Sequence, residues 1–546
     1  MLSVMDDDDY NLEVLGYKPS FRREFSNLAT ISFAFSILGL CSSIAMTFNT
    51  PLLLGGPASA TWCWLLGSCL CFTLGSSIAE IVSAFPTCGG LYTASAQLCP
   101  LSHRAIVGWI VGWLSILGQT AGLASSEFGV ANMILAAVTI ASPSFEITQG
   151  KTVGLFTGLL ITHGTLNSIA TKYLAFYARG FVFVNLGATI VIIIVLLATT
   201  PRSEMHTASY VFGSLGIINQ TGGWNTGIAF LFGLLSVQWT ARDPFVLISS
   251  LMTGDYDATA HISEEVRRAA YAAPSAIFIA VIGTGILGWI LTIVLVLCSG
   301  NIKDLPGVSG SAFLQIMVLR MGTPVALFLW SFVCLTGFFV VQTGLQAGSR
   351  TFYAFSRDHG FPDHGYFGHI SKWTQTPLRA IWLITIMSIL PGFLDLASPI
   401  AANAIFALTA MALDLSYIIP IFLRRVYGNH PEVQFKPGPF YMGPGIVGWV
   451  ANVACISWTL FVCVVFSLPT VLPVTKENMN YAAIITVGVI VLSGLWYILG
   501  AHRHYHGPTS NLEGKAGTKL GTNEARPTNA LRVDIPEKHM EQDYVA

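Results

Sequence analysis

Charged side chains are scarce in this chain. Asp, Glu, Lys and Arg make up 10% of its 546 residues, against about 25% in a typical soluble domain. Hydrophobic residues make up 53%, and the mean hydropathy is +0.64. Twelve apolar stretches divide nearly the whole chain, and almost every charge falls between them. Because a hydrocarbon core of about 30 Å takes about 20 helical residues to cross, the sequence predicts an all-α polytopic membrane protein.

Other absences exclude whole classes of function. The net charge is −1 and no basic stripe is present to neutralise phosphates, so no nucleic-acid partner is expected. Most of the ten cysteines lie inside apolar segments and none forms a C-x-x-C pair, so we interpret them as packing residues and expect no metal site. There is no H-E-x-x-H zinc helix and no convincing Ser/His pair. We therefore expect no catalytic residue, no cofactor and no enzymatic activity.

The N-terminal residues show no pattern of a cleavable signal peptide. Asp6–Asp9 are acidic, and no positively charged region precedes an apolar core. We expect the first span to act as its own insertion signal. The predicted spans, of which the sixth is interrupted, cover residues 28–54, 59–84, 104–140, 152–170, 174–198, 226–262, 272–298, 322–355, 378–394, 398–421, 446–470 and 480–500.

Basic residues are unevenly distributed between the predicted loops. With the N-terminus in the cytoplasm, twelve of them fall in cytoplasmic loops and five in outer loops. The first set is Arg104, Lys172, Arg179, Arg267, Arg268, Arg350, Arg357, Lys372, Arg379, Arg424, Arg425 and Lys436, and the second is Lys151, Arg202, Lys303, Arg320 and Lys476. This asymmetry follows the positive-inside rule. We expect both termini in the cytoplasm and the protein in the plasma membrane.

The first span carries small polar residues near the middle of the bilayer. It contains the run Phe35-Ser-Ile-Leu-Gly39-Leu-Cys-Ser42-Ser43-Ile44. A helix broken at this depth is tolerated where it lines a cavity, and transporters use its free backbone groups to hold substrate and ions. Close packing of helices through small residues is the alternative. Spacing alone leaves both interpretations open.

Several ordered motifs resemble those of one transporter superfamily. They are Leu54-Gly-Gly-Pro-Ala58, Trp62-Cys-Trp64, Ser77-Ile-Ala-Glu80-Ile-Val-Ser-Ala-Phe-Pro86-Thr-Cys-Gly89-Gly90-Leu-Tyr92, Gly118-Gln119-x-Ala121, His261-Ile-Ser-Glu264-Glu265, Ser349-Arg350-x-x-Tyr353-Ala354-x-x-Arg357-Asp358-x-Gly360-x-Pro362 and Phe466-Ser-Leu-Pro469. From Gly16 to Pro508 the chain is similar to the amino acid–polyamine–organocation permeases. It most resembles their fungal amino acid/choline branch, which includes GABA permeases and choline transporters.

The resemblance implies twelve transmembrane helices in a LeuT-like arrangement. Two inverted repeats of five helices are followed by two C-terminal helices, and helices one and six are broken at the binding site. The implied divisions are a cytoplasmic tail, the first repeat with broken helix six, the rest of the second repeat, helices eleven and twelve, and a disordered cytoplasmic tail. Their ranges are 1–26, 27–262, 263–421, 422–500 and 501–546.

The resemblance also implies which residues bind the substrate. The backbone of the first break would face the charged ends of the substrate, the Gln-Trp-Thr stretch of helix six would lie beside it, and two glutamines would form walls. For each glutamine, an amide that bridges two helices is the alternative. The implied substrate-binding residues are Gly39, Leu40, Cys41, Ser42, Ser43, Gln119, Trp239, Thr240 and Gln342.

Ionisable residues inside the predicted spans are costly to bury and usually functional. Glu80 lies near the cytoplasmic end of helix two and is a candidate gate residue, unless it simply reaches water. Glu127 lies deeper on helix three, where it would face an outer vestibule or titrate with protons; Asp414 is a weaker candidate. His163 on helix four has a side chain suited to relaying protons, with a hydrogen-bonded interior histidine as the alternative.

Helix six departs from the family pattern. Relatives pass from a Gln-Trp-Thr-like stretch almost directly into an acidic-aromatic break similar to Asp255-Tyr256-Asp257. Here Gln238-Trp239-Thr240 is followed by 241–251 before the pattern resumes. Asp243-Pro244 does not readily continue a helix, and Arg242 brings a charge to membrane depth. The segment is either a mis-spliced or mis-predicted stretch or an added loop that alters the pocket.

These observations predict a secondary active transporter for amino acids or related amines such as GABA. It would work by alternating access with proton symport, and its partners would be the small-molecule substrate, protons and the lipid bilayer. Choline is the alternative substrate, because a quaternary ammonium favours aromatic faces. A nutrient receptor that keeps the transporter fold is the alternative from another class. The aromatic candidates for choline are Trp239, Phe35, Phe232 and Tyr256.

Overall fold

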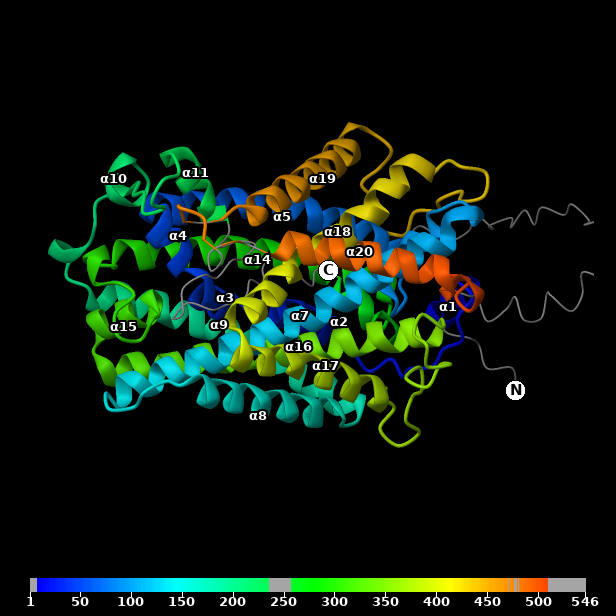
Figure 1. The fold of residues 1–546 in the computed structure, drawn as a ribbon, viewed down its shortest axis with the longest axis horizontal. Coiled ribbons are helices and arrows are strands. Elements are labelled where there is room, and N and C mark those ends of the chain that lie inside the picture. Colours follow the sequence, from blue (N-terminus) through cyan, green and yellow to red (C-terminus); the bar gives the residue numbers. More distant parts are fainter. Residues whose placement is uncertain (1–6, 235–256, 470, 476–478, 480, 509–546) are drawn as a thin grey trace, which may run out of the picture.

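The computed structural model describes residues 7–234, 257–469, 471–475, 479 and 481–508. Within these residues the chain is built of helices, with one isolated β-bridge between Phe25 and Val266. Ten of the described helices are long and apolar enough to cross a membrane, and they run side by side in one bundle (Figure 1).

These ten helices correspond to ten of the predicted spans. They are α2 with α3 and α4 (Asn27–Leu38, Leu40–Thr47 and Asn49–Leu54), α5 (Pro57–Ala84), α7 (Leu101–Ala141), α9 (Thr171–Thr199), α14 (Ala269–Leu297), α16 (Thr323–Arg357), α17 (Leu378–Ala397), α18 (Pro399–Tyr427), α19 (Ile446–Ser467) and α20 (Ala482–Leu499). The predicted fourth span is α8 (Gln149–Asn167), a 19-residue helix that falls outside the apolar set. Most of the predicted sixth span lies in 235–256, outside the described residues.

Shorter helices connect the long ones. They are α1 (Asp7–Val14), α6 (Gly90–Gln97), α10 (Ala208–Val211), α11 (Thr226–Leu231), α13 (Ala258–His261) and α15 (Ala312–Met321), with 3-10 turns η1 (Arg202–Glu204), η2 (Ser214–Gly216), η3 (Phe232–Leu234), η4 (Ser263–Glu265), η5 (Ile302–Asp304) and η6 (Ala501–Arg503).

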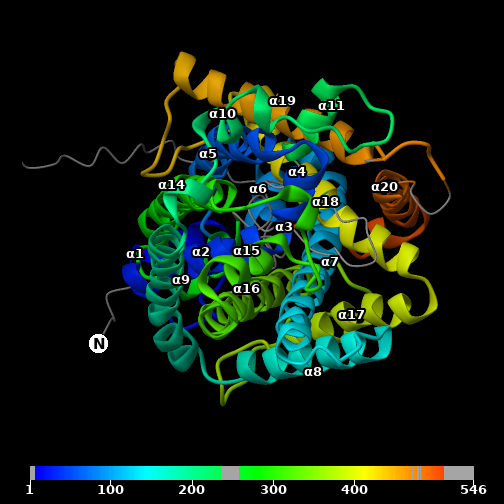
Figure 2. The ribbon, with the colours of Figure 1, turned by 90° about the vertical axis from the view of Figure 1, so that its left-hand side faces the viewer.

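Helix α7 is the longest helix, with 41 residues, and it contacts α8, α16, α17 and α18. The view along the bundle in Figure 2 shows α8 and α17 side by side at one edge, where they pack against each other. Glycines allow these helices to approach closely: the position of a Cβ on Gly118 would lie 2.6 Å from Leu413 Cγ of α18. Helices α7 and α18 therefore pack closely at this point.

The two ends of the bundle differ, and we name them after α1 and α10 (Figure 1). The described chain both starts and finishes at the α1 end. The Arg268 backbone N–H at the start of α14 donates to Asp8 of α1 at 2.5 Å. Pro508 lies beside Gly108 in the early part of α7. The N-terminal segment before α2 is thus folded onto the bundle.

The outer face of the bundle is apolar. Helix α20 exposes most of its residues, with 17% of its apolar window buried, and α9 has 33% buried. An exposed apolar surface of this extent marks contact with lipid or protein rather than water. Large exposed apolar side chains on α9 and α20 include Phe176, Tyr177, Phe183, Ile194, Ile484, Leu492, Ile498 and Leu499.

Candidate functional site

The first membrane helix is broken at Gly39. Helix α2 ends at Leu38, α3 starts at Leu40, and Gly39 between them has φ 48° and ψ 65°. Its N–H donates to the carbonyls of Phe35 at 3.2 Å and Ser36 at 3.1 Å. This left-handed conformation favours glycine. A Cβ at this position would also collide with Val340 of α16.

Small polar side chains satisfy the carbonyls that the break frees. Ser43 Oγ donates to the Leu38 carbonyl at 2.8 Å, and Ser42 Oγ donates to the Gly39 carbonyl at 3.1 Å. Cys41 Sγ lies 3.2 Å from Thr336 Oγ1 of α16. Leu40 is fully buried beside them. The structure therefore gathers residues 39–43 around one buried break, with the first N–H groups of α3 lacking partners within that helix.

The predicted second half of the site lies in helix six, and Trp239, Thr240 and the 241–251 segment lie outside the described residues. The described chain resumes at Asp257, which leads into α13. Asp257 Oδ2 lies 2.8 Å from His261 Nε2, and Tyr417 OH of α18 donates to Asp257 Oδ1 at 3.0 Å. A second irregular segment, α13 with η4, therefore lies inside the bundle and contacts α2.

The structure separates the two glutamines that the sequence assigns to the walls. Gln119 Oε1 lies 3.3 Å from the Cβ position of Gly348 on α16. Gly348 is eight residues beyond Val340, the neighbour of Gly39, and this corresponds to about 12 Å along a helix. Gln119 therefore lies further toward the α1 end than the break. Gln342 extends instead toward α8, where its Oε1 lies 2.9 Å from His163 Nδ1.

Three polar side chains meet inside the bundle between α7, α8 and α16. Glu127 and His163 are both fully buried, and their Oε2 and Nε2 atoms lie 3.1 Å apart. This contact lacks the alignment of a hydrogen bond, and both Glu127 oxygens are without a hydrogen-bond partner in the structure. The sequence singled out each of these residues, but it did not bring them together.

Glu80 makes a paired contact with Arg424 in the last turn of α18. Both carboxylate oxygens lie 2.8 Å from guanidinium nitrogens, and the Met442 backbone N–H donates to Glu80 Oε1 at 3.2 Å. The Glu80 side chain is fully buried, so it does not reach water. It connects α5 with α18 and with the loop before α19.

A group of ion pairs at the α1 end was not assigned from the sequence. Arg350 Nε lies 2.7 Å from Glu265 Oε1, and Arg357 Nη1 lies 3.3 Å from Glu264 Oε1. Burial raises the pKa of the Glu265 carboxyl, because loss of hydration outweighs the attraction of Arg350. These pairs join η4 to α16. All four residues belong to the motifs that carry the resemblance, and only the fold reveals their pairing.

The N-terminal segment covers these ion pairs. Tyr17 OH donates to Asp358 Oδ2 at 3.2 Å, and Tyr92 OH donates to the same oxygen. Burial raises the pKa of Asp358 to about 6, although Arg357 and the two hydroxyls oppose the shift. Arg23 Nη1 donates to the Val266 carbonyl at 3.0 Å. Tyr17 and Arg23 gave no sequence signal, because they precede the first apolar span.

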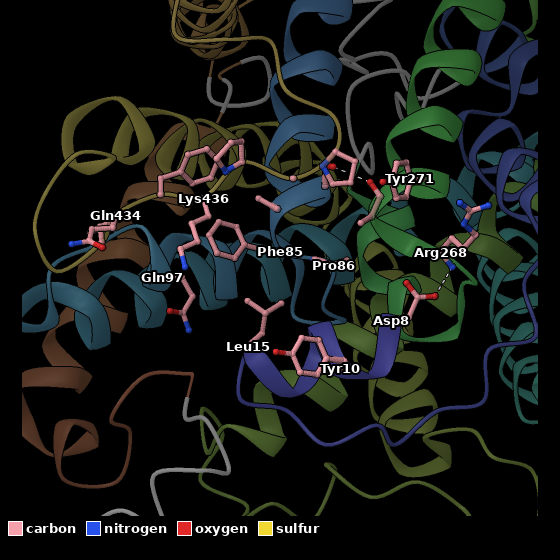
Figure 3. Close-up of a pocket in the computed structure, with 18 of the residues that line it drawn as sticks. Asp8, Tyr10, Leu15, Phe85, Pro86, Gln97, Arg268, Tyr271, Gln434 and Lys436 are labelled. Atoms are coloured by element: carbon pink, nitrogen blue, oxygen red, sulfur yellow. Dashed lines mark hydrogen bonds between the residues drawn. The ribbon is translucent and has the colours of Figure 1, made fainter. Parts of the chain in front are cut away.

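A cleft of ≈ 1080 Å³ opens at the α1 end between α1, the end of α5 and the loop before α19 (Figure 3). Asp8 and Tyr10 lie on one side of it, and Phe85 and Lys436 lie across from them. Among the described residues that line this cleft, none is a predicted binding residue. The cleft is therefore a feature of the bundle end, separate from the helix break.

A model of the family described as Amino acid permease matches residues 28–490 of the chain. The chain belongs to this family. An uncharacterized amino-acid permease of Schizosaccharomyces pombe is 40% identical over 519 residues, which cover 93% of this chain and 91% of the relative. Amino-acid permease 2 of Neurospora crassa is 37% identical, with 93% and 90% covered. The GABA-specific permease of Saccharomyces cerevisiae is 31% identical, with 92% and 86% covered.

Membership of the amino acid permease family confirms the predicted superfamily. The permease is an integral membrane protein with a small-molecule substrate such as an amino acid, and its relatives are named as transporters rather than enzymes. Its apolar helical bundle agrees with a polytopic permease. The match begins at residue 28, so α1, Tyr17 and Arg23 lie before it.

Proposed function

We propose that this permease carries amino acids or related amines such as GABA across the plasma membrane in symport with protons, by alternating access. The observation that supports this best is the buried break at Gly39, where α2 ends and α3 begins against α16. A helix interrupted inside an apolar bundle places polar backbone N–H and C=O groups in the apolar interior. Transporters use such interruptions to hold polar substrates.

The two helix ends at the break differ in sign, and this suits a zwitterion. The first turn of α3 presents N–H groups and the positive end of its dipole, which favour a carboxylate. The last turn of α2 presents carbonyls and the negative end, which favour an ammonium. Ser42 and Ser43 hold two of these carbonyls by hydrogen bonds. A substrate with both charges, such as GABA or another amino acid, complements both helix ends.

We propose further that the fold is the LeuT-like one with twelve helices, in which helices one to ten form two inverted repeats. The second broken helix would include α13 and η4, which contact α2 and α16. Both termini would lie in the cytoplasm. The charge asymmetry of the loops supports a cytoplasmic location of both termini. The position of α1 and Pro508 at the same end of the bundle agrees with it.

The ion pairs at the α1 end would then form the cytoplasmic gate. Each joins the irregular segment of η4 to α16, and Tyr17 of the N-terminal segment covers them. Glu264 Oε2 and Glu265 Oε2 have no hydrogen-bond partner among the described residues. A buried polar network that is only partly satisfied costs less to break than a complete one. Such a network suits contacts that must open in every transport cycle.

Uptake of labelled solutes in permease-deficient cells tests the proposal. GABA, choline and a mixed amino-acid panel would be compared in cells that express either the chain as written or a chain without residues 241–251. We expect accumulation of GABA or another amino acid that collapses when a protonophore removes the proton gradient. Accumulation by the shortened chain alone would mark 241–251 as an artefact of splicing or gene prediction. Accumulation by the full chain would make it part of the pocket.

Two results would contradict the proposed function. Accumulation of choline, with no accumulation of any amino acid, would identify choline rather than amino acids as the substrate. Both chains at the cell surface without accumulation of any solute would favour the receptor on a transporter fold. A transport-independent signal in response to an amino acid would then identify that receptor.

A further inference from the structure

We propose that Glu127, His163 and Gln342 form the site that binds the coupled proton. The inference rests on the proposed proton symport and names the groups that carry the proton. The three residues come from α7, α8 and α16, three helices that contact one another. Glu127 and His163 are 0% exposed, and Gln342 is 6% exposed.

Hydrogen bonding fixes the form of the imidazole. The Gln342 side-chain oxygen only accepts hydrogen bonds, so His163 Nδ1, at 2.9 Å from it, carries a hydrogen. In the neutral imidazole, Nε2 then bears a lone pair, and Glu127 Oε2 lies 3.1 Å from Nε2, outside the alignment of a hydrogen bond. Two lone pairs at this separation repel each other. One additional proton converts the contact into an attraction.

The additional proton has two places in this contact. It either makes His163 an imidazolium beside the Glu127 carboxylate, or it makes Glu127 a carboxylic acid that donates to Nε2. Both forms have no net charge. Release of the proton to water leaves a neutral imidazole and a carboxylate, with one negative charge. The site therefore exchanges one proton, and no other bond forms or breaks.

Burial connects the proton to the state of the bundle. Neither Glu127 oxygen has a hydrogen-bond donor in the structure. An ionised carboxylate without donors is costly in a dry interior. The proton-free site therefore leaves a carboxylate without donors inside the closed bundle, and entry of water would supply donors to it. Loading or release of the proton would thus bias the bundle between closed and open states.

The surroundings isolate the site from other charges. The ring of Phe338 of α16 packs against the imidazole of His163, with the centroids 4.1 Å apart and the planes tilted by 39°. Asn167 Nδ2 donates to the carbonyls of His163 at 3.1 Å and Gln342 at 3.2 Å, which joins α8 to α16. A shift of α8 against α16 would therefore alter the geometry of the proton site directly.

The charged residues of the packed helices lie at other levels of the bundle. On α18, Asp414 follows Leu413, which meets Gly118, nine residues before Glu127. On α17, Asp395 lies near Gly392, which meets Phe156, seven residues before His163. The remaining Asp, Glu, His, Lys and Arg residues on these helices are His103 and Arg104 on α7, Lys151 on α8, Lys172 and Arg179 on α9, Arg350 and Arg357 on α16, Arg379 on α17, and Arg424 and Arg425 on α18. Their titratable tyrosines and cysteine are Tyr173 and Tyr177 on α9, Cys334 and Tyr353 on α16, and Tyr417 and Tyr427 on α18.

Reconstitution of the purified full-length permease into lipid vesicles tests the assignment, with labelled GABA as the probe. One assay measures GABA–GABA exchange without a pH gradient, which requires no net proton movement. The other measures GABA accumulation under an imposed pH gradient, together with proton entry reported by a pH dye. The variants are Glu127→Gln and His163→Gln, and Asp395→Asn serves as a control that removes another buried carboxylate.

We expect both site variants to keep exchange and to lose gradient-driven accumulation and GABA-dependent proton entry, while the control keeps all three. If Glu127→Gln still accumulates GABA with proton entry, the assignment of the proton site is overturned, and the proposed transport function is not affected. Loss of exchange in both site variants, with the control unaffected, assigns the residues a structural role and also overturns it. Unaltered protein that exchanges GABA without proton entry overturns the proposed symport. Unaltered protein that exchanges neither GABA nor any member of the amino-acid panel overturns the proposed substrate class.

Discussion

At the scale of single residues, Gly39 is the most constrained position of the proposed binding site. Its φ of 48° disfavours any side chain, and a Cβ there would collide with Val340. We predict that Gly39→Ala costs about 1–2 kcal/mol from the backbone alone, with a further cost of about 1–3 kcal/mol from overpacking. Uptake should be lost even where the protein reaches the membrane.

The matched control for this prediction is Gly154→Ala on α8. Gly154 has ordinary helical backbone, is exposed, and has no atom within 4 Å of its Cβ position. Alanine favours a helix over glycine by about 1 kcal/mol, so this variant should melt at the same or a higher temperature. Melting curves in detergent and uptake assays would be compared for both variants. Normal uptake by Gly39→Ala would show that the break at Gly39 is not part of the substrate-binding site.

Asp358 gives the α1 end a pH dependence. Burial raises the pKa of Asp358 to about 6, above about 3.9 for an unfolded Asp. The folded protein therefore keeps a proton that the unfolded chain has lost, so stability falls as pH rises between these two values. The loss is on the order of 3 kcal/mol and is complete above the folded pKa.

Asp358→Asn should remove this contribution, because the amide does not ionise. The difference in melting temperature between the variant and the unaltered protein should grow as pH rises from about 4 to about 7. The exposed Asp304→Asn provides the control, and it should leave the pH profile unchanged. Parallel profiles for Asp358→Asn and the unaltered protein would show that Asp358 is ionised in the fold without penalty.

At the scale of elements, the contact between η4 and α16 depends on the Arg350–Glu265 pair. The side chains of these residues are 0% and 1% exposed. Glu265→Gln leaves a buried guanidinium without its counter-charge, and removing one partner of a buried pair costs about 3–5 kcal/mol. We expect a clear fall in melting temperature and faster leakage of substrate through the α1 end.

The pair of Arg320 and Glu204 provides the control, because its carboxylate lies at the surface although the Arg320 side chain is only 9% exposed. The Glu204 side chain is 57% exposed, and exposed ion pairs contribute about 0–1 kcal/mol. Glu204→Gln should therefore leave the melting temperature nearly unchanged. An equally small effect of Glu265→Gln would mean that this carboxyl is already neutral in the fold, and the gate would then depend on the Arg357–Glu264 contact.

The sequence predicts elements better than it predicts contacts. Length and hydropathy place eleven of the twelve predicted spans on described helices, and ten of these helices are long and apolar enough to cross a membrane. The break at Gly39 was one of two interpretations of the small polar residues in this apolar span, and the family resemblance decided between them. The pairing of Glu127 with His163 was not, because it depends on how α7 rotates against α8. Helices that are apolar all round give no periodic signal for that rotation.

The same reason explains why the sequence did not predict the ion pairs of the proposed cytoplasmic gate. The motifs that carry the resemblance contain Glu264, Glu265, Arg350 and Arg357, yet nothing in their order states which acid meets which base. Tyr17 was invisible for another reason: it lies in a polar segment before the first span, where no hydropathy pattern marks it. Long-range pairing therefore needed the three-dimensional structure.

At the scale of the whole molecule, the α1 end and the middle of the bundle are held together by different kinds of contact. The α1 end is joined by ion pairs and covered by the N-terminal segment. The middle holds a helix break and a buried Glu–His contact. The proposed alternating access would require that the ion pairs at the α1 end open while the helix break stays intact. The variants Gly39→Ala and Glu265→Gln test these two parts of the molecule separately.

The most direct test of the central claim is solute counterflow by the purified permease in lipid vesicles. Vesicles loaded with unlabelled amino acid are diluted into a trace of the labelled amino acid, without any pH gradient. The account predicts a transient accumulation of label above its equilibrium level, which is absent with Gly39→Ala. A vesicle preparation of folded permease that shows no overshoot with GABA or any member of the amino-acid panel would contradict the claim that this chain transports amino acids.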